Sequence, residues 1–475
     1  MKDNNDKLGK LYLLFLYIIL GAFLLFLIPS NLNNHDYESY LVLWLSYILV
    51  GGIFTFTMLI KKVDIIEPYV FVTIIFLIMF SLVPLINIVT NDTLSFGVNV
   101  MDSSIKATIV YVLSYISFQI AYFFKWKPKS TINNISSRNQ IVFWDLTEKQ
   151  KNWIYKICLV LWCLFYLFSL IYILSSGTSL IYIFTIGLAG SVNISNSTDT
   201  PLGFLGMFNY SLIPIWLYIS HCGKNKLLNY ILFYLTFGTF LVRGFRFVLV
   251  ILIIAPFVFK YLKEGKRPNG FKISGLSVII IFMIGLVGYV RDNLRVGQMI
   301  DWTNFNLEFI KDALIGNFNV YQGYYAIVKV APDIVSFSGL APVYNTIIMF
   351  IPRAIFPSKR YLDSTGEMTR IGISEYATQA GFAAPNLGEF YACFGLIGCI
   401  VGMIIFARFC VYIKRKYTKD TPNIHDLILY SVLFPSILQL IIRGYLPSNF
   451  YLILFLVIPG LFIKFILKGS AKDHD

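Results

Sequence analysis

The sequence predicts an all-α, polytopic integral membrane protein with about twelve transmembrane helices. Hydrophobic residues make up 57% of the 475 residues and charged residues only 13%, whereas soluble domains are about 25% charged. The apolar residues also gather into runs of roughly 20, the length that a helix needs to cross a hydrocarbon core of about 30 Å. These two observations exclude a soluble enzyme, a disordered scaffold and a nucleic-acid-binding domain. The net charge of +14 therefore bears on orientation in the membrane and does not indicate a nucleic acid partner.

The predicted spans follow one another with short connections until late in the chain. We expect them at residues 11–29, 41–60, 69–90, 107–124, 153–175, 202–220, 227–242, 247–262, 276–290, 390–413, 427–442 and 450–467. The first run is too long for the apolar core of a signal peptide and lacks a small-residue cleavage site, so we expect it to remain as a span. The runs 227–242 and 247–262 are short, but we count them as two spans. A single span across both would place Arg243 and Arg246 at mid-bilayer, where charged side chains are costly. No internal repeat divides the chain, so residues 1–475 form one predicted domain.

The basic residues predict how the spans are oriented. With a cytoplasmic N-terminus, Lys and Arg number 27 on the inner side and 12 on the outer side. Cytoplasmic loops of membrane proteins carry an excess of Lys and Arg, so we expect both termini to be cytoplasmic. This topology places residues 291–389 outside as a loop of 99 residues. Loops of this length are usually lids or binding loops, so the outer side is where we expect the function.

Arg and Lys are divided unevenly between the two sides. Of the 27 inner residues 23 are Lys, whereas eight of the 12 outer residues are Arg. Either residue can orient a span, but Arg offers a planar fork that binds phosphate or carboxylate and that stays charged when buried. The set therefore predicts an anion-binding site at the outer face. For any single Arg, an ion pair with an outer acid or a lipid headgroup is an equal alternative.

The outer Arg come from separate stretches of chain that the topology brings to one level of the membrane. They lie between two spans (Arg243 and Arg246), at the start of the long loop (Arg291 and Arg295), in an apolar run along the membrane surface (Arg353), farther along the loop (Arg360 and Arg370) and at the end of the eleventh span (Arg443). Arg243 and Arg246 are three residues apart and share a face if the local chain is helical. This placement favours one composite anion site.

The long loop also mixes aromatic and amide side chains. They include Trp302, Asn304, Asn306, Asn317, Asn319, Tyr321, Gln322, Tyr324 and Tyr325. Aromatic rings can pack on the apolar faces of sugars while amides bond their hydroxyls, so this lining suits a glycan. Aromatic residues are also common at any membrane interface, which leaves a plain interfacial role open.

Glu389 differs from the other acidic residues of the long loop because it lies at the mouth of a span. Partial desolvation there suits a carboxylate to general-base chemistry. The alternative is an acidic residue that faces the positive end of its own helix dipole. The glycines that follow, Gly395, Gly398 and Gly402, are expected to allow close helix packing.

Several kinds of chemistry have no counterpart in the sequence. The long loop contains no His, and the outer loops contain no pair of acidic residues spaced to hold a metal ion. Nucleotide-binding glycine motifs and zinc-binding HExxH are missing as well. We therefore expect no metal and no cofactor, and an outer site that binds phosphate through Arg.

Two segments resemble a known family. Residues 351–360 (IPRAIFPSKR) and 388–398 (GEFYACFGLIG) are similar to the O-antigen polymerase (Wzy) and related oligosaccharide repeat-unit polymerases. Members carry Pro-Arg followed by Pro-x-Lys, then Gly-Glu-x-Tyr, and an Arg-rich element before an earlier span. Many have Lys-Pro where this chain has Lys359 and Arg360.

The resemblance implies a fold, a reaction and a set of partners. It implies the GT-C-like polymerase and ligase architecture, and an inner-membrane enzyme that moves glycan from one undecaprenyl-diphosphate carrier onto the repeat unit of another at the periplasmic face. The substrates are thus a lipid-linked donor and a lipid-linked acceptor among membrane lipids, and a chain-length regulator is a further candidate partner. The resemblance and the charge pattern together assign catalytic roles to Glu389 and Arg353, and diphosphate or substrate binding to Arg243, Arg246, Arg291, Arg295, Lys359, Arg360 and Arg443.

Two other functions remain as alternatives. An O-antigen ligase would share the architecture, but the ligase family has a functional His in its large outer loop and this loop has none. A lipid-linked oligosaccharide flippase also has about twelve spans, but it needs no outer loop of 99 residues. The sequence therefore favours the polymerase.

Overall fold

The protein is helical almost throughout the part that the structure describes. The computed structural model describes residues 34–124, 146–175, 203–264, 318–373 and 383–472 apart from scattered positions, and a few residues within 17–28 and 275–286. These residues are 84% helical, and the strands among them are a two-residue hairpin, β1 (Leu94–Ser95) with β2 (Val98–Asn99). The predicted all-α class is therefore confirmed.

Ten of the twelve predicted spans coincide with described helices. These are α2 (Asn34–Ile60); α3 (Pro68–Leu77) with η1 (Ile78–Leu82) and α4 (Val83–Val89); η2 (Met101–Ser103) with α5 (Ser104–Phe123); α6 (Glu148–Ser175); η5 (Gly203–Ser211) with α9 (Leu212–Cys222); α10 (Lys226–Val242); α11 (Arg246–Glu264); α17 (Asn386–Tyr417); α18 (Ile424–Ile442); and α19 (Leu446–Lys472). Seven of these segments are long and apolar enough to cross a membrane. The other predicted spans, 11–29 and 276–290, lie largely outside the described residues, so the count of twelve stays a prediction.

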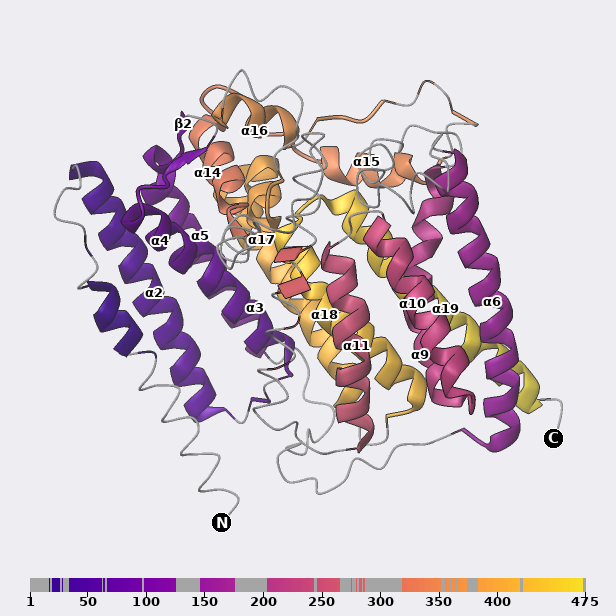
Figure 1. Ribbon diagram of the computed structural model, residues 1–475. Coiled ribbons are helices and arrows are strands. Elements are labelled where there is room, and N and C mark those ends of the chain that lie inside the picture. The colour runs from indigo at the N-terminus through magenta and orange to yellow at the C-terminus, as the bar shows by residue number, and fades with distance from the viewer. Residues whose placement is uncertain are drawn as a thin grey trace, which may run out of the picture.

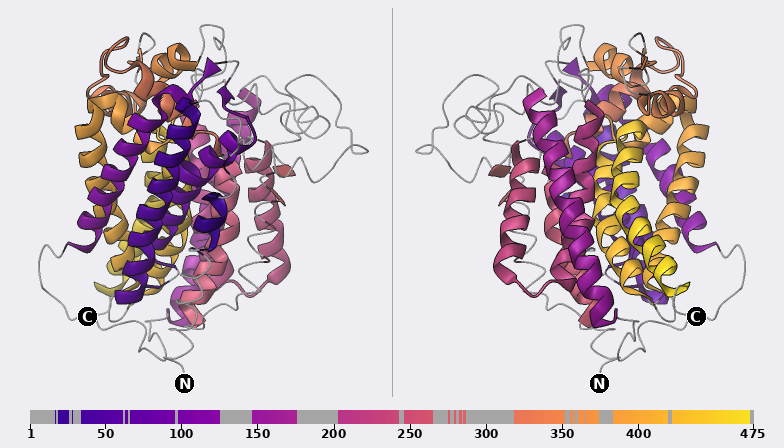
Figure 2. Two further views of the ribbon diagram at one scale, coloured as in Figure 1. Left: turned by 90° about the vertical axis from the view of Figure 1, so that its left-hand side faces the viewer. Right: turned by 90° about the vertical axis from the view of Figure 1, so that its right-hand side faces the viewer.

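The long helices stand side by side as one bundle (Figures 1 and 2). Helix α17 packs against α5 and α18, α11 packs against α18, and α6 packs against α9. Three shorter helices come from the predicted outer loop: α14 (Tyr321–Val330), α15 (Ala341–Met349) and α16 (Gly366–Ile373). Figure 1 shows all three at one end of the bundle, where α15 lies across the ends of neighbouring helices. We call this end the α14–α16 end.

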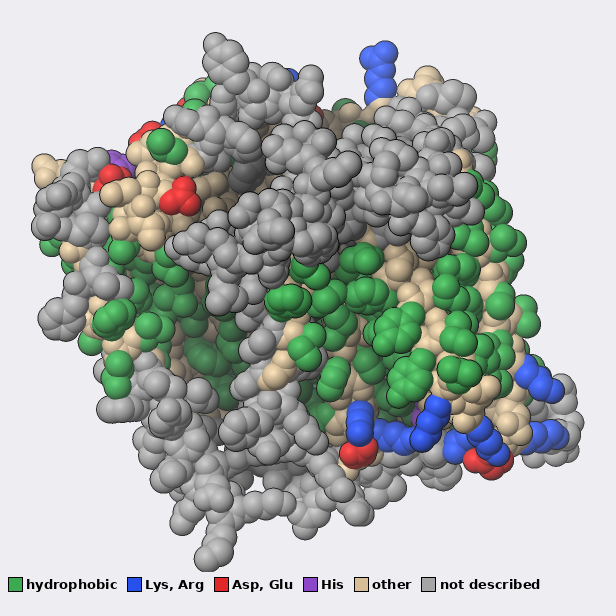
Figure 3. All heavy atoms as spheres, viewed as in Figure 1, with side chains coloured by type: hydrophobic (Ala, Val, Ile, Leu, Met, Phe, Trp, Pro, Cys, Tyr) green, Lys and Arg blue, Asp and Glu red, His purple; other side chains and the backbone are tan. Residues whose placement is uncertain are grey.

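The surface of the bundle has the composition of a membrane protein. Figure 3 shows a broad belt of apolar side chains on this face, with Lys and Arg side chains gathered along the lower edge, away from the α14–α16 end. Exposed side chains of the long helices are correspondingly apolar, for example Phe56, Val160 and Ile405. The bundle therefore belongs in a membrane, with a basic rim on the end opposite α14–α16.

A buried ion pair fastens the bundle at that opposite end. Glu67 precedes α3 and is only 3% exposed, and Lys414 near the end of α17 pairs with it at 2.5 Å. The Tyr122 hydroxyl donates to the same carboxylate at 3.3 Å, and the Tyr430 hydroxyl donates to the carbonyl of Ile66. Buried charge is tolerated when it is paired and hydrogen-bonded in this way. These contacts hold α3, α5, α17 and α18 together at the end of the bundle opposite α14–α16.

Candidate functional site

The structure describes four of the predicted site residues. They are Arg246, Arg360, Glu389 and Arg443, whereas Arg243, Arg291, Arg295, Arg353 and Lys359 lie outside the described residues. What can be built from contacts is therefore the part of the site around Glu389 and the two helix-end arginines. Their roles remain predictions.

Glu389 lies in the first turn of α17 and reaches across to the start of another helix. Its side chain is 3% exposed, and its two carboxylate oxygens accept hydrogen bonds from the backbone N–H of Leu446 at 3.0 and 2.9 Å. Leu446 is the first residue of α19, so its N–H belongs to the group that a helix leaves without an internal partner. Glu389 thus satisfies the beginning of α19. Glu389 also lies in the first turn of its own helix, as the predicted alternative requires, and its hydrogen bonds go to the start of α19.

The chain between α18 and α19 is held against the start of α17 by further contacts. The N–H of Gly444 donates to the carbonyl of Ala384 at 2.9 Å, and the Asn449 side-chain amide donates to the carbonyl of Arg443. A Cβ on Gly444 would lie 2.4 Å from the carbonyl oxygen of Pro385, so only glycine fits this approach. Residues 384–389, 443–446 and 449 form one packed unit, which we call the α17–α19 junction.

Arg246 and Arg443 lie at the same end of the bundle. Arg246 begins α11 and Arg443 directly follows α18, and these two helices pack together. The opposite parts of both helices contact residues 64–66. Tyr261 of α11 donates to Asp64 at 3.4 Å, and the Tyr430 hydroxyl of α18 donates to the carbonyl of Ile66. At 1.5 Å per residue, each arginine therefore lies about 20 Å from that segment. Both side chains are half-buried. Arg443 lies three residues before Leu446, whose N–H Glu389 accepts, so both arginines belong to the end of the bundle that carries Glu389.

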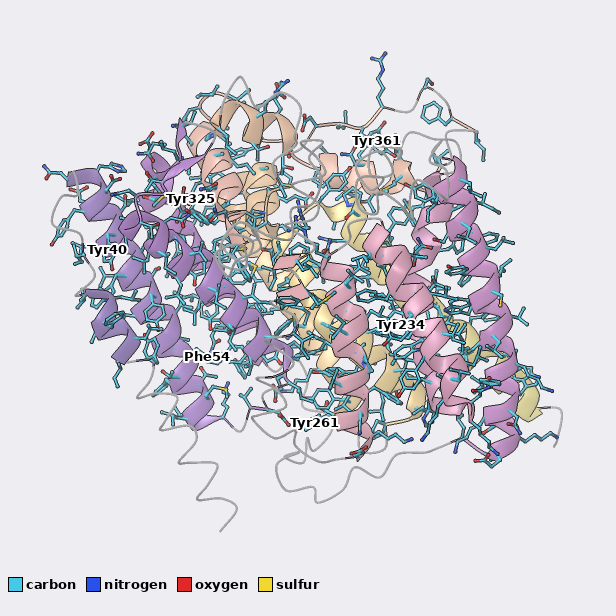
Figure 4. The ribbon with its side chains drawn as sticks, viewed as in Figure 1. Tyr40, Phe54, Tyr234, Tyr261, Tyr325 and Tyr361 are labelled. Carbon is cyan, nitrogen blue, oxygen red and sulfur yellow. The ribbon has the colours of Figure 1, made fainter. Side chains whose placement is uncertain are left out.

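Residues 360–363 of the long loop are held over the same end. The side-chain amide of Asn345 in α15 donates to the carbonyl of Leu362 at 2.7 Å and accepts its N–H at 2.9 Å. Figure 4 shows Tyr361 at the end of the bundle where α15 and α16 lie. Arg360, next to it, is exposed. Arg360 is thus exposed at the surface of the α14–α16 end, while Glu389 is buried.

Tyr445 links the loop to the junction. Partial burial of its phenol raises the pKa of Tyr445 to about 12, and the nearby Glu389 and Asp363 add to this effect. The hydroxyl therefore remains neutral at physiological pH. Because Tyr445 is 38% exposed, it borders the junction on a side that a ligand can reach.

Helix α17 is broken shortly after Glu389. Phe394 and Gly395 have non-helical backbone angles, and Gly395 has φ +61°, a conformation that glycine adopts at little cost. The carbonyls left open by the break are satisfied by the preceding loop, since the N–H of Ser338 donates to Ala392 at 2.8 Å and that of Gly339 donates to Cys393 at 3.1 Å. Gly395 was expected to serve helix packing; its backbone conformation instead separates a short first segment of α17, which carries Glu389, from the long remainder.

The aromatic residues of the long loop are packed in the interior. Tyr321, Tyr324 and Tyr325 lie on α14 and are at most 1% exposed. Figure 4 shows Tyr325 among α4, α5 and α14, and the Tyr324 hydroxyl donates to the carbonyl of Ala107 in α5 at 2.9 Å. The expected glycan lining is therefore wrong for these three residues. Tyr321, Tyr324 and Tyr325 stand at positions i, i+3 and i+4, which lie on one face of a helix. This spacing is the signal in the sequence that predicts a buried helical face for them.

Comparison with known proteins identifies the family. The family model O-antigen polysaccharide polymerase Wzy matches residues 12–474. This is nearly the whole chain, so the chain belongs to this family, whose general function is O-antigen polymerisation. No curated protein and no solved structure matches. Within the described residues, no group of three or more His, Cys, Asp or Glu could hold a metal ion.

The close approach of Gly444 to Pro385 gives a first prediction. In Gly444→Ala the added methyl must displace the backbone of the junction, and overpacking of this kind typically costs about 1–3 kcal/mol. We expect a lower thermal unfolding midpoint for the purified protein and shorter polymer on a lipopolysaccharide gel. Gly238→Ala in α10 is the matched control, because its Cβ meets nothing within 4 Å. Equal behaviour of the two variants would show that the junction does not require glycine.

Proposed function

We propose that this protein joins undecaprenyl-diphosphate-linked oligosaccharide repeat units into O-antigen or a related surface polysaccharide. The reaction takes place at the periplasmic face of the bacterial inner membrane, with both termini of the chain in the cytoplasm. The observation that carries the proposal is the α17–α19 junction, where a buried carboxylate lies at the same end of the bundle as two half-buried arginines. The substrates arrive within the membrane on their lipid carriers, and a chain-length regulator is a candidate partner.

The reaction has two chemical demands that this arrangement can meet. The acceptor hydroxyl oxygen attacks the anomeric carbon of the donor glycan, the bond from that carbon to the diphosphate oxygen breaks, and the carrier diphosphate leaves with the bonding electrons. Negative charge therefore grows on the diphosphate, while the attacking hydroxyl must lose its proton. Arginine side chains stabilise the negative charge on the diphosphate, and a carboxylate accepts the proton of the hydroxyl.

The arginines serve the leaving group in this proposal. Arg246 and Arg443 supply guanidinium groups at the helix ends, and Arg243, Arg291, Arg295, Arg353, Lys359 and Arg360 complete two cationic sites, one for each carrier diphosphate. Arg353 acts at the reacting phosphate. Hydrogen bonds to charged groups contribute about 1.5–3 kcal/mol each, so a few of them in a desolvated site account for a large part of the acceleration. Because the charge is met by Arg, the reaction needs no metal ion.

Glu389 is the general base in this proposal. The Leu446 N–H holds the carboxylate in one orientation and occupies only one of the two lone pairs on each oxygen. A free lone pair can therefore accept the proton of the acceptor hydroxyl. The wall of the site next to it is neutral, because Tyr445 stays protonated.

Deletion of the gene separates this function from its two rivals. We expect lipopolysaccharide that carries a single repeat unit, because units are still made, moved across the membrane and attached one at a time. Loss of a ligase would leave no repeat unit on the lipid, and loss of a flippase would leave little or none. A gel of lipopolysaccharide from the deletion strain distinguishes these results, and a ladder of normal length would contradict the proposal.

Arg-to-Lys exchange tests whether the arginines grip phosphate through two hydrogen bonds. Lys keeps the charge but not the planar fork, so Arg246→Lys and Arg443→Lys should lower the polymerisation rate by roughly ten- to a hundredfold at unchanged protein level. Arg415→Lys, an exposed residue at the opposite end of α17, is the control and should keep the full ladder. Wild-type ladders from both site variants would reduce these arginines to orienting or packing roles.

Glu389→Gln tests the general base. The amide oxygen of Gln can still accept the Leu446 N–H, so the start of α19 stays satisfied and we expect the protein to fold. The side chain can no longer take a proton, and loss of a positioned base lowers a rate by about a hundred- to ten-thousandfold. The rate is measured with purified protein and lipid-linked repeat units. Retention of more than about a tenth of the rate would move the role to Asp363 or Asp292, of which Asp363→Asn is the direct comparison.

A further inference from the structure

Two buried amides at the α17–α19 junction each have one atom without a hydrogen-bond partner. Asn386 is 3% exposed and Asn449 is 6% exposed. The Asn386 Nδ2 atom and the Asn449 Oδ1 atom are both enclosed and unbonded. An unpaired buried polar group costs free energy that a folded protein normally avoids, so two of them in one place call for a ligand that completes them.

The bonds that these amides do make fix which atom of each is free. Asn386 Oδ1 accepts the N–H of Leu387 at 2.8 Å, which leaves its NH₂ group as a free donor. Asn449 Nδ2 donates to the carbonyl of Arg443, which leaves its carbonyl oxygen as a free acceptor. The junction therefore presents one unused donor and one unused acceptor.

Both free atoms belong to the immediate surroundings of Glu389. Asn386 and Glu389 are three residues apart in the first turn of α17 and share a face of that helix. The backbone N of Asn386 would be 2.7 Å from a Cβ on Gly444, and Asn449 bonds the carbonyl of the residue before it. The two amides thus flank the Arg443–Gly444 peptide from the two helices that Glu389 connects.

The chemistry of these groups selects a hydroxyl over a phosphate. A sugar hydroxyl both donates and accepts, so it can give its hydrogen to Asn449 or Glu389 and receive one from Asn386. Unprotonated phosphate oxygens only accept, and they would face the Asn449 carbonyl and the Glu389 carboxylate with no hydrogen to offer. The diphosphates therefore belong with the arginines, and this junction suits the sugar.

We propose that Asn386 and Asn449 form, with Glu389, the subsite that holds the hydroxyl-bearing sugar of the acceptor repeat unit. The assignment rests on the proposed polymerase function and adds to it the part of the site that orients the acceptor. The sugar reaches the junction beside Tyr445, whose partly exposed ring offers a surface for its apolar face. Asn386 donates to the attacking oxygen or to a neighbouring hydroxyl, and Asn449 accepts from the sugar, so the reacting hydroxyl is set against Glu389.

Two substitutions of Asn386 test the subsite. Asn386→Asp keeps the oxygen that accepts the Leu387 N–H and replaces the free NH₂ donor with an acceptor. Asn386→Ser adds no charge and shortens the side chain, so that its hydroxyl does not reach the position of the Asn386 Nδ2 atom. Ser adds no charge to this buried position, where an unpaired carboxylate would be costly, so we expect the unfolding midpoint of Asn386→Ser to stay near the wild-type value. The initial polymerisation rate is measured against the concentration of repeat units isolated from the deletion strain. We expect kcat/KM for the acceptor to fall by about tenfold or more in both variants.

Ser169→Ala provides the control. Ser169 of α6 is fully buried, and its hydroxyl also lacks a partner, but it lies on a helix outside the junction, so we expect unchanged kinetics. If the wild-type enzyme forms no polymer from these repeat units, the polymerase function itself fails. If the wild type polymerises and both Asn386 variants keep its kcat/KM, the subsite is wrong while the function stands. A loss of rate that is matched by a lowered unfolding midpoint would likewise overturn the subsite, because it shows a structural role.

Discussion

The arrangement of the α14–α16 end depends on the bond between the Glu389 carboxylate and the Leu446 N–H. A carboxylate that is 3% exposed would cost several kcal/mol if it had no partner, and the first N–H of α19 would also lack one. Each group satisfies the other, and the contact joins two helices through residues that are 57 positions apart along the chain. Gly444 and Asn449 complete the junction. The Asn449 side chain bonds the carbonyl of Arg443 and the next residue, Gly444, bonds Ala384, so the backbone of Arg443 is held in place.

The two ends of the bundle bury charge for different reasons. At the end with the basic rim, Glu67 pairs with Lys414 at 2.5 Å, and this ion pair holds α17 against the start of α3. At the other end, Glu389 accepts the backbone N–H of Leu446, and the amides beside it keep free atoms. In the proposed function these free atoms bind the sugar, whereas the Glu67–Lys414 pair holds helices together. The predicted inner side of the sequence is rich in Lys, and the predicted outer side is rich in Arg.

Hydropathy was enough to predict the helices but not how the loop between them folds. Ten predicted spans coincide with helices, because a membrane demands long apolar segments in any sequence. The predicted start at residue 390 missed the first turn of α17, since polar residues end a hydropathy run while the backbone remains helical from Asn386. The tyrosines of α14 looked like a loop lining because burial against α5 is a tertiary contact that no local pattern states. Glu389 could be singled out from its position at the end of a span, but its partner Leu446 lies too far along the chain for the sequence to reveal it.

We propose that a buried carboxylate and arginine side chains at this end of the bundle join lipid-linked glycans. The most direct measurement counts products from the purified protein in liposomes that contain only lipid-linked repeat units. We expect glycans that grow in steps of one repeat unit, with one undecaprenyl diphosphate released for each linkage formed and no added metal ion required. Repeat units that cross the bilayer without being joined would contradict it, as would linkages formed without release of the carrier diphosphate.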